Sequence, residues 1–585
     1  MPSLTSQEKK PESDIVGTLM SLTVAFTLAM AFRGFVLEGF VIPTGSMGPT
    51  LMGAHARLRS PISGFEYPVD GTPVAPSVQV VDPMFAPTKP IGELTAQSLV
   101  QQARGGDRVL VLKPLYAFSE PARWDVVVFK VPTDPVGASQ NYIKRLVGLP
   151  GEQFLVVDGD VFTGPSDADK QQLTIERKPE FVQRAVWQPV HDSDYQPVPP
   201  LESVEKALSS GVGPNGTFRW DRGPWRVMAG DATKWAMAPA RAWTYSGTGR
   251  TMLAWDIQPW PVDDWNCYNA LRMAEEASRR SARGVADIGT RHDMCFAVSD
   301  LRLCAALETA DLRGFSTTFR LVARSQEFDF ALRVGDDLTG TMTLSRRPQG
   351  MVGDAAPDAA ADAAPDAAPD AASPDARTSF PFTARTDGHL AIEFWHVDQQ
   401  LWAFIDGALV GTMPYEFGSL DERVTCSLVG RTPEQYAKQA TATRGPTPPR
   451  LEWTLDAKAP VTLHRVRVDR DLYYRPALHS PVNQFAVNGD TLVGAAFGTD
   501  YAKPERLGPD DFVMLGDNSA ASRDSRLWGR SHAITLQTCG DAQPGVVPRD
   551  LIVGKAWCVY FPATVPGWPE GWKTVLDFGR VRLIR

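Results

Sequence analysis

The strongest constraint on this chain is an uncharged apolar run near its N-terminus, residues 15–32. As an α-helix, its 18 residues would span roughly 27 Å, just enough to cross the hydrocarbon core of a bilayer. A second apolar stretch follows at 34–41, and no small-x-small cleavage site with a polar start follows cleanly. We therefore favour an uncleaved membrane anchor over a signal peptide that is removed.

The charges that flank the run set its expected orientation. Lys9 and Lys10 precede it, and Arg33 follows it. Because basic residues are enriched on the cytoplasmic side of a membrane span, this asymmetry favours a cytoplasmic N-terminus. We expect a cytoplasmic tail over 1–14, a single transmembrane anchor over 15–33, and the remaining chain on the extracytoplasmic side.

A candidate nucleophile lies just beyond the anchor, in the segment Thr-Gly-Ser-Met-Gly-Pro-Thr-Leu at 44–51. A serine hydroxyl such as that of Ser46 is a poor nucleophile until a base removes its proton. Histidine is the usual base, but the eight histidines of this chain share no common spacing. Lys144 is the better candidate, since it follows Tyr142 and Ile143 and precedes a Gly-Leu-Pro-Gly turn.

A third block, residues 516–529, concentrates small hydroxyls, amides and a carboxylate–guanidinium set between two strand-like runs. Taken singly, each block also has an ordinary interpretation. Ser46 would be a turn residue, Lys144 a solvated strand end, and the third block a turn, because Gly, Asp, Asn and Ser dominate turns. The blocks together, in this order after an anchor, favour a catalytic interpretation.

These blocks resemble those of bacterial type I signal peptidases, also called leader peptidases. The family pattern Ile-Pro-Ser-Gly-Ser-Met-x-Pro-Thr-Leu reads here as residues 42–51, with Thr44 in place of the first serine. The family block Arg-Gly-Asp-Val-Val-Val-Phe reads as 123–129, with Trp124 where glycine is usual. The lysine block and the third block match almost throughout. The resemblance covers roughly residues 10–52, 106–190 and 480–565, well under half of the chain.

The resemblance implies a serine endopeptidase with a Ser-Lys dyad. Ser46 would be the nucleophile and Lys144 the base, which requires the pKa of Lys144 to fall several units below about 10.4. Burial among apolar neighbours is the means, because it penalises the ammonium form. Ser522 would orient the amine of Lys144. The oxyanion would be held by the backbone N–H of Ser46 and the hydroxyl of Thr44.

Further residues take supporting roles by the same resemblance. Asp524 and Arg526 are interpreted as a structural ion pair that holds the third block. Four apolar or aromatic residues would line shallow pockets for small substrate side chains, with packing in the core as the open alternative. These pocket residues are Phe40, Ile42, Tyr142 and Ile143.

A large insertion is expected between the lysine block and the third block, which more than 350 residues separate. Many short alternating segments with turn signals predict a β-sandwich over 201–470. In texture it resembles the concanavalin-like jelly roll of lectin and laminin-G-type domains. Within it, an Asp-Ala-Pro repeat at 353–377 cannot bury apolar surface, so we expect a disordered loop there.

The rest of the chain is expected to form the catalytic core. Its first part is 34–200, with a smaller insertion at 55–105 and a strand at 184–190, and its second part is 471–585. With the sandwich between these parts and one N-terminal transmembrane helix, the predicted fold class is mainly β.

Composition argues against nucleic-acid and metal sites. Net charge is −9, but six aspartates lie in the repeat, so the remainder is close to neutral and has no basic footprint for nucleic acid. The six cysteines show no Cys-x-x-Cys pair and no metal-ligand spacing. A Ser-Pro-x-Ser-Gly segment at 60–64 is similar to a zinc-ribbon knuckle with serine at both ligand positions, and serine is a poor zinc ligand. We expect no metal and no cofactor.

The resemblance predicts removal of N-terminal signal peptides from exported preproteins, with small residues at the −1 and −3 positions of the cleavage site. Expected partners are these secretory preproteins and the bilayer of the cytoplasmic membrane, with the translocon as a further candidate. One open alternative is a catalytically idle homologue whose sandwich binds carbohydrate or a protein partner at the cell surface. Another is a Ser-Lys hydrolase of cell-wall peptides, which is disfavoured because the Ser-x-x-Lys motif would need a lysine at Pro49.

Overall fold

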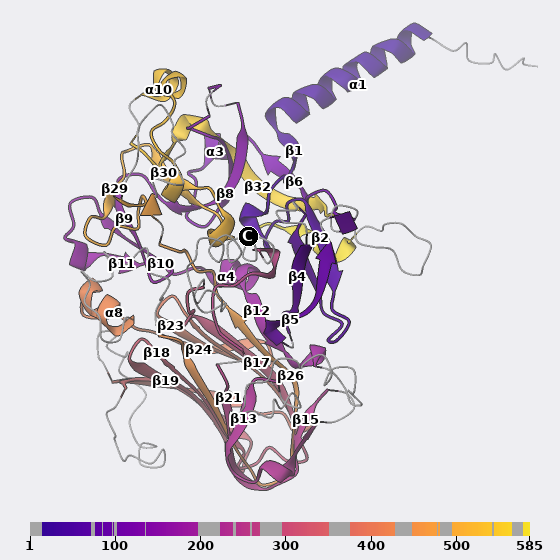
Figure 1. Cartoon of the computed structure of the whole chain (residues 1–585), viewed down its shortest axis with the longest axis vertical. Helices are drawn as coiled ribbons and strands as arrows, with labels where there is room; N and C mark the ends of the chain where they lie inside the picture. Colours follow the sequence, from indigo (N-terminus) through magenta and orange to yellow (C-terminus); the bar gives the residue numbers. More distant parts are fainter. Residues whose placement is uncertain are drawn as a thin grey trace, which may run out of the picture.

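The structure, a computed structural model, is mainly β: among the residues that it describes, strands account for 45% and helices for 18%, which confirms the predicted fold class. Figure 1 shows one long helix that projects from a body built of several sheets. The structure describes residues 15–71, 77–84, 86–95, 97–98, 102–134, 136–137, 139–196, 223–237, 241–257, 260–269, 295–349, 375–427, 447–476, 478–479, 494–540, 543–563 and 577–585.

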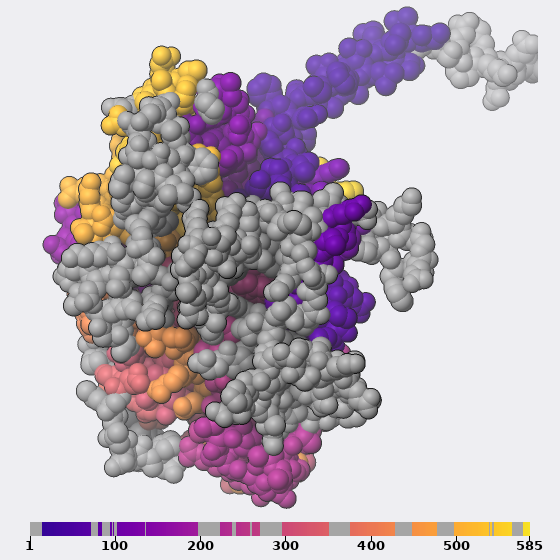
Figure 2. Space-filling model, in the orientation of Figure 1, coloured from indigo at the N-terminus to yellow at the C-terminus, as the bar shows by residue number. Residues whose placement is uncertain are grey.

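The projecting helix is α1 (Ile15–Phe35), of 21 residues, none of which is buried. Figure 2 shows it standing clear of the rest of the molecule. Its length and apolar composition suffice to cross a bilayer, a property that a signal sequence would share. The helix extends two residues beyond the predicted anchor at 15–33.

An antiparallel sheet follows directly from α1 through β1 (Leu37–Val41). Its strand order is β1-β6-β32-β7-β8-β30-β31, with β33 paired to β32. Strands from the end of the chain pair with strands from its beginning, with β32 between β6 and β7 and β30 next to β8. The sheet therefore joins the segments on either side of the long middle region (Figure 1). Its other strands are β6 (Arg108–Leu112), β7 (Val126–Lys130), β8 (Asn141–Gly148), β30 (Asp511–Leu515), β31 (Val547–Pro548), β32 (Ile552–Phe561) and β33 (Arg582–Leu583).

A second sheet, of order β11-β10-β9-β29, packs beside the first. One apolar cluster joins them, and it includes Val147 of β8, Phe154 of β9 and Val513 of β30. Short helices flank this region: α3 (Leu115–Phe118), α4 (Glu180–Val186) and α10 (Ala533–Cys539). The strands of the second sheet are β9 (Glu152–Val157), β10 (Asp160–Pro165), β11 (Thr174–Ile175) and β29 (Glu505–Arg506).

The smaller insertion at 55–105 contains two hairpins, β2 (His55–Arg59) with β3 (Glu66–Asp70) and β4 (Ser77–Asp82) with β5 (Ala86–Thr95). At the turn that is similar to a zinc knuckle, the Ser60 hydroxyl donates to Asp82 at 2.5 Å. The N–H of Ser63 donates to the same carboxylate at 3.2 Å. A buried carboxylate therefore organises this turn.

The middle region forms two antiparallel sheets that share one apolar core. Buried residues alternate with less buried ones along strands such as β17 and β19, as in a two-layer sandwich. The first sheet has β14 (Trp235–Met237), β15 (Trp243–Tyr245), β26 (Val461–Arg470), β17 (Leu301–Thr309), β22 (His389–Val397), β23 (Gln400–Ile405), β24 (Ala408–Pro414) and, paired to β26, β12 (Gln188–Asp192). The second has β13 (Trp225–Ala229), β16 (Gly249–Trp255), β25 (Arg450–Ala457), β18 (Ser316–Ala323), β19 (Gln326–Val334), β20 (Thr339–Pro348) and β21 (Ala376–Thr383).

Three sequence-based expectations in this region are either wrong in part or concern residues that the structure mostly does not describe. The strand predicted at 184–190 is wrong over its first part, where α4 continues to Val186, and β12 begins only at Gln188. Because β12 pairs with β26, the sandwich sheet recruits chain from before the predicted boundary at 201. The disorder predicted at 353–377 lies mostly outside the described residues, and its end is set too late, since β21 begins at Ala376.

The sheets that contain β8 and β9 include the segments predicted to form the catalytic core, and we call them the catalytic-side sheets. These sheets and the sandwich meet at the tips of three hairpins. Each tip is a two-residue turn in which both residues have positive φ, the geometry of a tight type I′ hairpin. The turns are 158–159 between β9 and β10, 324–325 between β18 and β19, and 398–399 between β22 and β23. Their side chains form a buried network of charges, in which Arg324 donates to Asp158 of the facing tip at 3.1 Å.

Candidate active site

The candidate nucleophile lies in a short 3₁₀ turn, η1 (Gly45–Met47), that follows β1. All three residues of the turn are buried. The turn is closed by two backbone bonds of 2.9 Å, from the N–H of Gly48 to the Gly45 carbonyl and from the N–H of Leu51 to the Met47 carbonyl. Ser46 is thus held on a compact, hydrogen-bonded loop at the end of a sheet strand.

Lys144 lies on β8, where it pairs with Val127 of β7, and its side chain is only 3% exposed. Its Nζ atom is 2.6 Å from Ser46 Oγ and donates a second bond to the Ile143 carbonyl at 3.1 Å. The Tyr142 ring lies 5.2 Å from the same nitrogen. The structure therefore brings the two predicted dyad residues into direct contact.

Burial lowers the pKa of Lys144 to about 8. The carboxylates of Asp524 and Asp517 act in the opposite direction, and the guanidinium of Arg526 lowers it further. Within the described residues, Lys144 forms no ion pair that would fix its charge. A neutral amine is therefore accessible close to physiological pH, as a general base requires.

The third block closes over the serine turn. The N–H of Asn518 donates to the Ser46 carbonyl at 3.1 Å, and the Asn518 amide donates to the Gly45 carbonyl at 2.9 Å. Gly516 leaves no room for a side chain, since a Cβ there would lie 2.2 Å from Ser522 Oγ and 2.5 Å from the Ser46 carbonyl oxygen. Glycine at this position lets the third block approach the nucleophile.

Ser522 reaches the site, but not in the hydrogen bond expected for it. It is 4% exposed, and its hydroxyl has no hydrogen-bond partner among the residues that the structure describes. The bonds of Lys144 go to Ser46 and Ile143 instead. Orientation of Lys144 by Ser522 thus remains a prediction.

Asp524 and Arg526 form a buried bidentate pair, with Nε–Oδ1 and Nη2–Oδ2 distances of 2.9 and 2.7 Å. Asp524 also accepts the N–H of Gly516 at 3.0 Å. Arg526 donates to the Ser519 hydroxyl at 2.6 Å and to the Arg475 carbonyl at 2.9 Å. The pair ties together the loop that faces the serine turn, which is the geometry that a structural role needs.

A second buried pair, which the motifs did not single out, links the lysine block to the third block. Arg145 contacts Asp517 through Nε–Oδ1 and Nη2–Oδ2 distances of 2.8 and 2.7 Å, and neither side chain is exposed. Arg145 also donates to the Trp124 carbonyl at 2.9 Å. Both residues stand inside blocks that the sequence identified, but nothing in their local sequence indicates that they pair.

Trp124, which replaces the glycine usual in the resembling family, has a φ of 75°. Left-handed backbone of this kind favours glycine and strains a bulky residue. Here the indole is 5% exposed and lies in the apolar cluster between the two catalytic-side sheets, with Lys178 Nζ 5.2 Å from its ring. Burial of the large ring offsets the backbone cost at this position.

The expected oxyanion and pocket residues are placed as follows. Thr44 is exposed, and its hydroxyl does not cap η1. Ile42 and Ile143 share one apolar cluster with Met47, and the half-buried Phe40 packs on it. Tyr142 belongs to a different cluster. The four pocket candidates are therefore divided between two packed regions.

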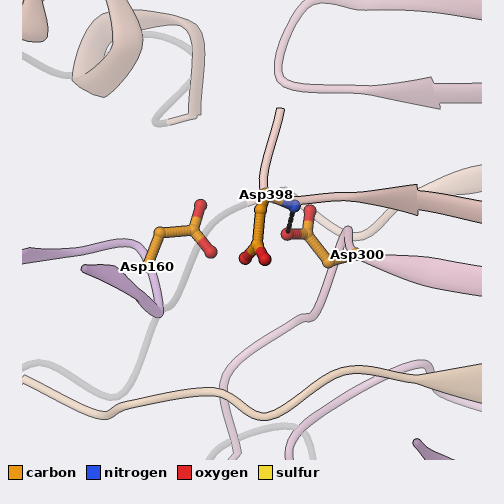
Figure 3. A group of neighbouring side chains, drawn as sticks. All are labelled: Asp160, Asp300 and Asp398. Carbon is orange, nitrogen blue, oxygen red and sulfur yellow. Dashed lines mark hydrogen bonds between the residues drawn. The ribbon is translucent and has the colours of Figure 1, made fainter. Parts of the chain in front are cut away.

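A group of three buried carboxylates lies beside the hairpin tips: Asp398 is in one tip, Asp160 begins β10, and Asp300 directly precedes β17. Figure 3 shows Asp160, Asp300 and Asp398, whose ligand-type atoms all lie within 4.8 Å of one another. Cations already fill this group: Arg324 Nη1 is 2.6 Å from Asp300, and Arg423 Nη2 is 2.9 Å from Asp160. The arrangement is that of a neutralised charge network rather than of an open metal site.

Comparison with known proteins relates part of the chain to signal peptidases. Residues 85–200 match the family of signal peptidases, peptidase S26. The probable signal peptidase I-2 of Synechocystis is 25% identical over 170 residues, which cover 28% of this chain and 54% of the relative. Signal peptidase I of Pseudomonas fluorescens is 30% identical over 126 residues, 21% of this chain and 29% of the relative. These matches support a relationship between this chain and the peptidase S26 family.

The S26 relationship concerns only part of each protein. The chain spans about half or less of the length of the curated relatives it matches, signal peptidase I of Rickettsia typhi (45%) among them. The S26 match at 85–200 contains Lys144 but neither Ser46 nor the third block. Together with α1, the S26 relationship suggests a membrane anchor.

Solved structures give no comparable guide to the sandwich. The transglycosylase Crh5 aligns with 48% of this chain and 82% of its own at 13% identity, with a TM-score of 0.23. The laminarinase catalytic domain of Thermotoga maritima aligns with 49% and 99% at 7% identity, with a TM-score of 0.24. Likenesses of this size carry no argument about the fold or the ligands of the S26-like chain.

Proposed function

We propose that this protein is a membrane-anchored serine endopeptidase that removes N-terminal signal peptides from exported preproteins. The observation that carries the proposal is the 2.6 Å contact between Lys144 Nζ and Ser46 Oγ. Burial of this contact lowers the pKa of Lys144 to about 8. The S26 relationship supports the substrate class. With α1 as a single anchor in the cytoplasmic membrane, the dyad lies on the extracytoplasmic side.

The proposed chemistry proceeds through an ester. Neutral Lys144 accepts the proton of Ser46 as Oγ attacks the carbonyl carbon of the last residue of the signal peptide. The backbone N–H of Ser46 and the hydroxyl of Thr44 stabilise the oxyanion. The ammonium of Lys144 then returns its proton to the leaving amine, which is the new N-terminus of the mature protein.

Hydrolysis of the ester repeats the same proton transfers, with water as the nucleophile. Lys144, neutral again, takes a proton from a water molecule that attacks the ester, and Ser46 regains its hydroxyl as the signal peptide departs. Substrate selection follows from the family resemblance: small side chains at −1 and −3, next to Ile42 and Ile143. Preproteins, the bilayer and, as a candidate, the translocon are the proposed partners.

The test uses the full-length protein in detergent with a preprotein whose cleavage site has alanine at −1 and −3. We expect release of the mature chain, measured by mass spectrometry, and its loss in both Ser46→Ala and Lys144→Ala. Ser119→Ala and Lys458→Ala, at exposed positions away from the dyad, serve as matched controls. Equal cleavage by Ser46→Ala and the parent would refute the dyad assignment.

A catalytically idle homologue is the rival that this experiment separates. It requires the sandwich to present a binding surface, yet the aromatic rings on the outer face of its first sheet pack against the chain itself. Trp395 is fully buried beneath Trp187, with ring centroids 5.5 Å apart, and Arg184 of α4 lies 4.8 Å from the Trp395 ring. The packing of these rings therefore supports the peptidase over the idle homologue.

A further inference from the structure

A short helix from the middle region lies against the serine turn. This element, η5 (Cys267–Asn269), comes between β16 and β17 and belongs to none of the three motif blocks. The Tyr268 ring, 1% exposed, packs on the turn so closely that a Cβ on Gly45 would lie 1.9 Å from it. A Cβ on Gly48 would lie 3.3 Å from the same ring. Tyr268 therefore covers both glycines that flank Ser46 and Met47.

Polar atoms of the same segment bind the backbone that follows the nucleophile. The hydroxyl of Tyr268 donates to the Ala54 carbonyl at 2.9 Å. The side-chain amide of Asn266 donates to the Gly48 carbonyl at 3.2 Å. These bonds and the ring contact hold the turn at its start, at its end and at the strand that follows it.

Asn269 reaches the serine turn through the third block. Its amide and that of Asn518 exchange two hydrogen bonds, of 2.6 and 2.8 Å, and both side chains are buried. This pairing orients the Asn518 amide, which donates to the Gly45 carbonyl, while the Asn518 N–H donates to the Ser46 carbonyl. A chain of contacts thus runs from the middle region to the residue that carries the nucleophilic oxygen.

The segment is itself firmly anchored. Arg475 Nη2 donates to Asp264 at 2.9 Å, and the N–H of Arg475 donates to the Ser519 hydroxyl of the third block at 2.8 Å. On the other side, Cys267 packs against the β2–β3 hairpin. The 264–269 segment is therefore fixed to the third block and to the β2–β3 hairpin, both of which lie next to the serine turn. A shift of this segment would consequently move the turn.

We propose that Tyr268 and Asn269 are positioning residues of the active site, supplied by the middle region, which hold the Ser46 turn within reach of Lys144. The inference rests on the proposed function. Its physical basis is the steep dependence of the reaction on geometry, because a displacement of about 1 Å of a reacting group costs about 100-fold in rate. A turn whose two glycines face a tyrosine ring collapses into the space left when that ring is removed.

The test compares Tyr268→Ala with Tyr268→Phe and with the matched control Tyr245→Ala in the full-length protein. Tyr245 is a buried tyrosine of the sandwich, 3% exposed, whose ring lies 5.2 Å from Trp235 and not on the turn. We expect Tyr268→Ala to lower kcat about 10- to 100-fold with KM changed less than about threefold, since the binding pockets remain. Tyr268→Phe keeps the ring and should retain most of kcat. Tyr245→Ala should also retain most of kcat, even if its Tm falls as far as that of Tyr268→Ala.

Asn269 provides an independent arm. Asn269→Asp removes the donor to Asn518 and should lower kcat about 10-fold or more, whereas Asn266→Asp, which loses a bond to Gly48 only, should have the smaller effect. Equal kcat losses in Tyr268→Ala and Tyr245→Ala, or none in Tyr268→Ala and Asn269→Asp, would overturn the inference.

A second readout separates failure of the inference from failure of the proposed function. The rate at which a serine-directed acylating inhibitor modifies Ser46, followed by intact mass, needs no preprotein. If the parent cleaves no preprotein but is acylated, the proposed substrate is wrong, and a slower acylation of Tyr268→Ala still supports positioning. If Ser46 of the parent is not acylated at all, both proposals fail.

Discussion

Lys144 and Arg145 are adjacent buried basic residues on β8, and they contact different kinds of partner, a neutral hydroxyl and a carboxylate respectively. Arg145 forms a bidentate pair with Asp517, whereas Nζ of Lys144 contacts a serine hydroxyl 98 residues away in the chain. Successive residues of a strand point to opposite faces of the sheet, which separates the two side chains. Burial acts to lower the pKa of both. For Arg145, Asp517 together with Tyr474 and Asp471 outweighs burial and raises the pKa, while the pKa of Lys144 falls to about 8. The sheet thereby keeps one cation charged and lets its neighbour become neutral.

The pH dependence of catalysis should follow Lys144. The base acts in its neutral form, so kcat/KM should rise as pH rises through the pKa of Lys144, with a midpoint near about 8, and reach a plateau above it. Initial rates of preprotein cleavage between pH 6 and about 10 measure this profile. A midpoint near about 6.5, the ordinary pKa of histidine, would assign the base to another residue.

Lys144 should also cost stability. Its pKa in the folded protein, about 8, is below the ordinary value of 10.5, so the unfolded chain binds the proton more tightly. Below pH 8, the penalty is on the order of 3 kcal/mol at 1.36 kcal/mol per pKa unit. It disappears as pH rises through 8 to 10.5. We expect Lys144→Met, which keeps the length of the side chain, to unfold at a higher Tm than the parent at pH 7.

The comparison of these two proteins at high pH is the control. The Tm advantage of Lys144→Met should shrink between pH 8 and 10.5, because the parent loses its proton there and the variant has none to lose. An advantage that is constant with pH would come from packing alone and would contradict the linkage.

The contact between Ser46 and Lys144 could be predicted from the sequence, whereas most of the contacts that hold these two residues in place could not. Ser46 and Lys144 stand in short blocks whose order is visible in the chain. The Arg145–Asp517 pair joins residues 372 apart, and no local pattern indicates which carboxylate a buried arginine will meet. Tyr268 lies in a stretch without any motif, and its role follows only from the space beside Gly45. Strand alternation predicted the sandwich core, but a helix at 180–186 and the recruitment of β12 depend on tertiary contacts.

The buried Arg145–Asp517 pair should be required for stability. Asp517→Ala leaves a fully buried guanidinium without its counter-charge, which costs about 3–5 kcal/mol when one partner of a buried pair is removed. Thermal unfolding of the full-length protein should show a large drop in Tm. Asp510→Ala removes one of the two exposed acidic partners of Arg549, the other being Glu120, and should change Tm little. Similar Tm losses in both variants would contradict the prediction.

Ser522→Ala should separate catalysis from stability. The Ser522 hydroxyl is buried without a partner among the described residues, so its removal leaves no donor or acceptor newly unpaired and should change Tm little. If the hydroxyl orients Lys144 once substrate is bound, kcat should fall about 10-fold or more, the scale of a lost general-base geometry. Unchanged kcat would instead show that Ser522 only fills space beside Gly516.

The charge network at the hairpin tips should be indifferent to chelators. Asp160 and Asp300 contact Arg423 and Arg324 at 2.9 and 2.6 Å, so guanidinium groups occupy the positions that a cation would need. EDTA should therefore leave the Tm of the parent unchanged. Arg423→Met leaves carboxylates of the network short of a counter-charge and should destabilise the protein by about 3–5 kcal/mol, the cost of breaking a buried pair. A fall in Tm of the parent on adding EDTA, reversed by calcium, would show instead that a metal ion holds the catalytic-side sheets and the sandwich together.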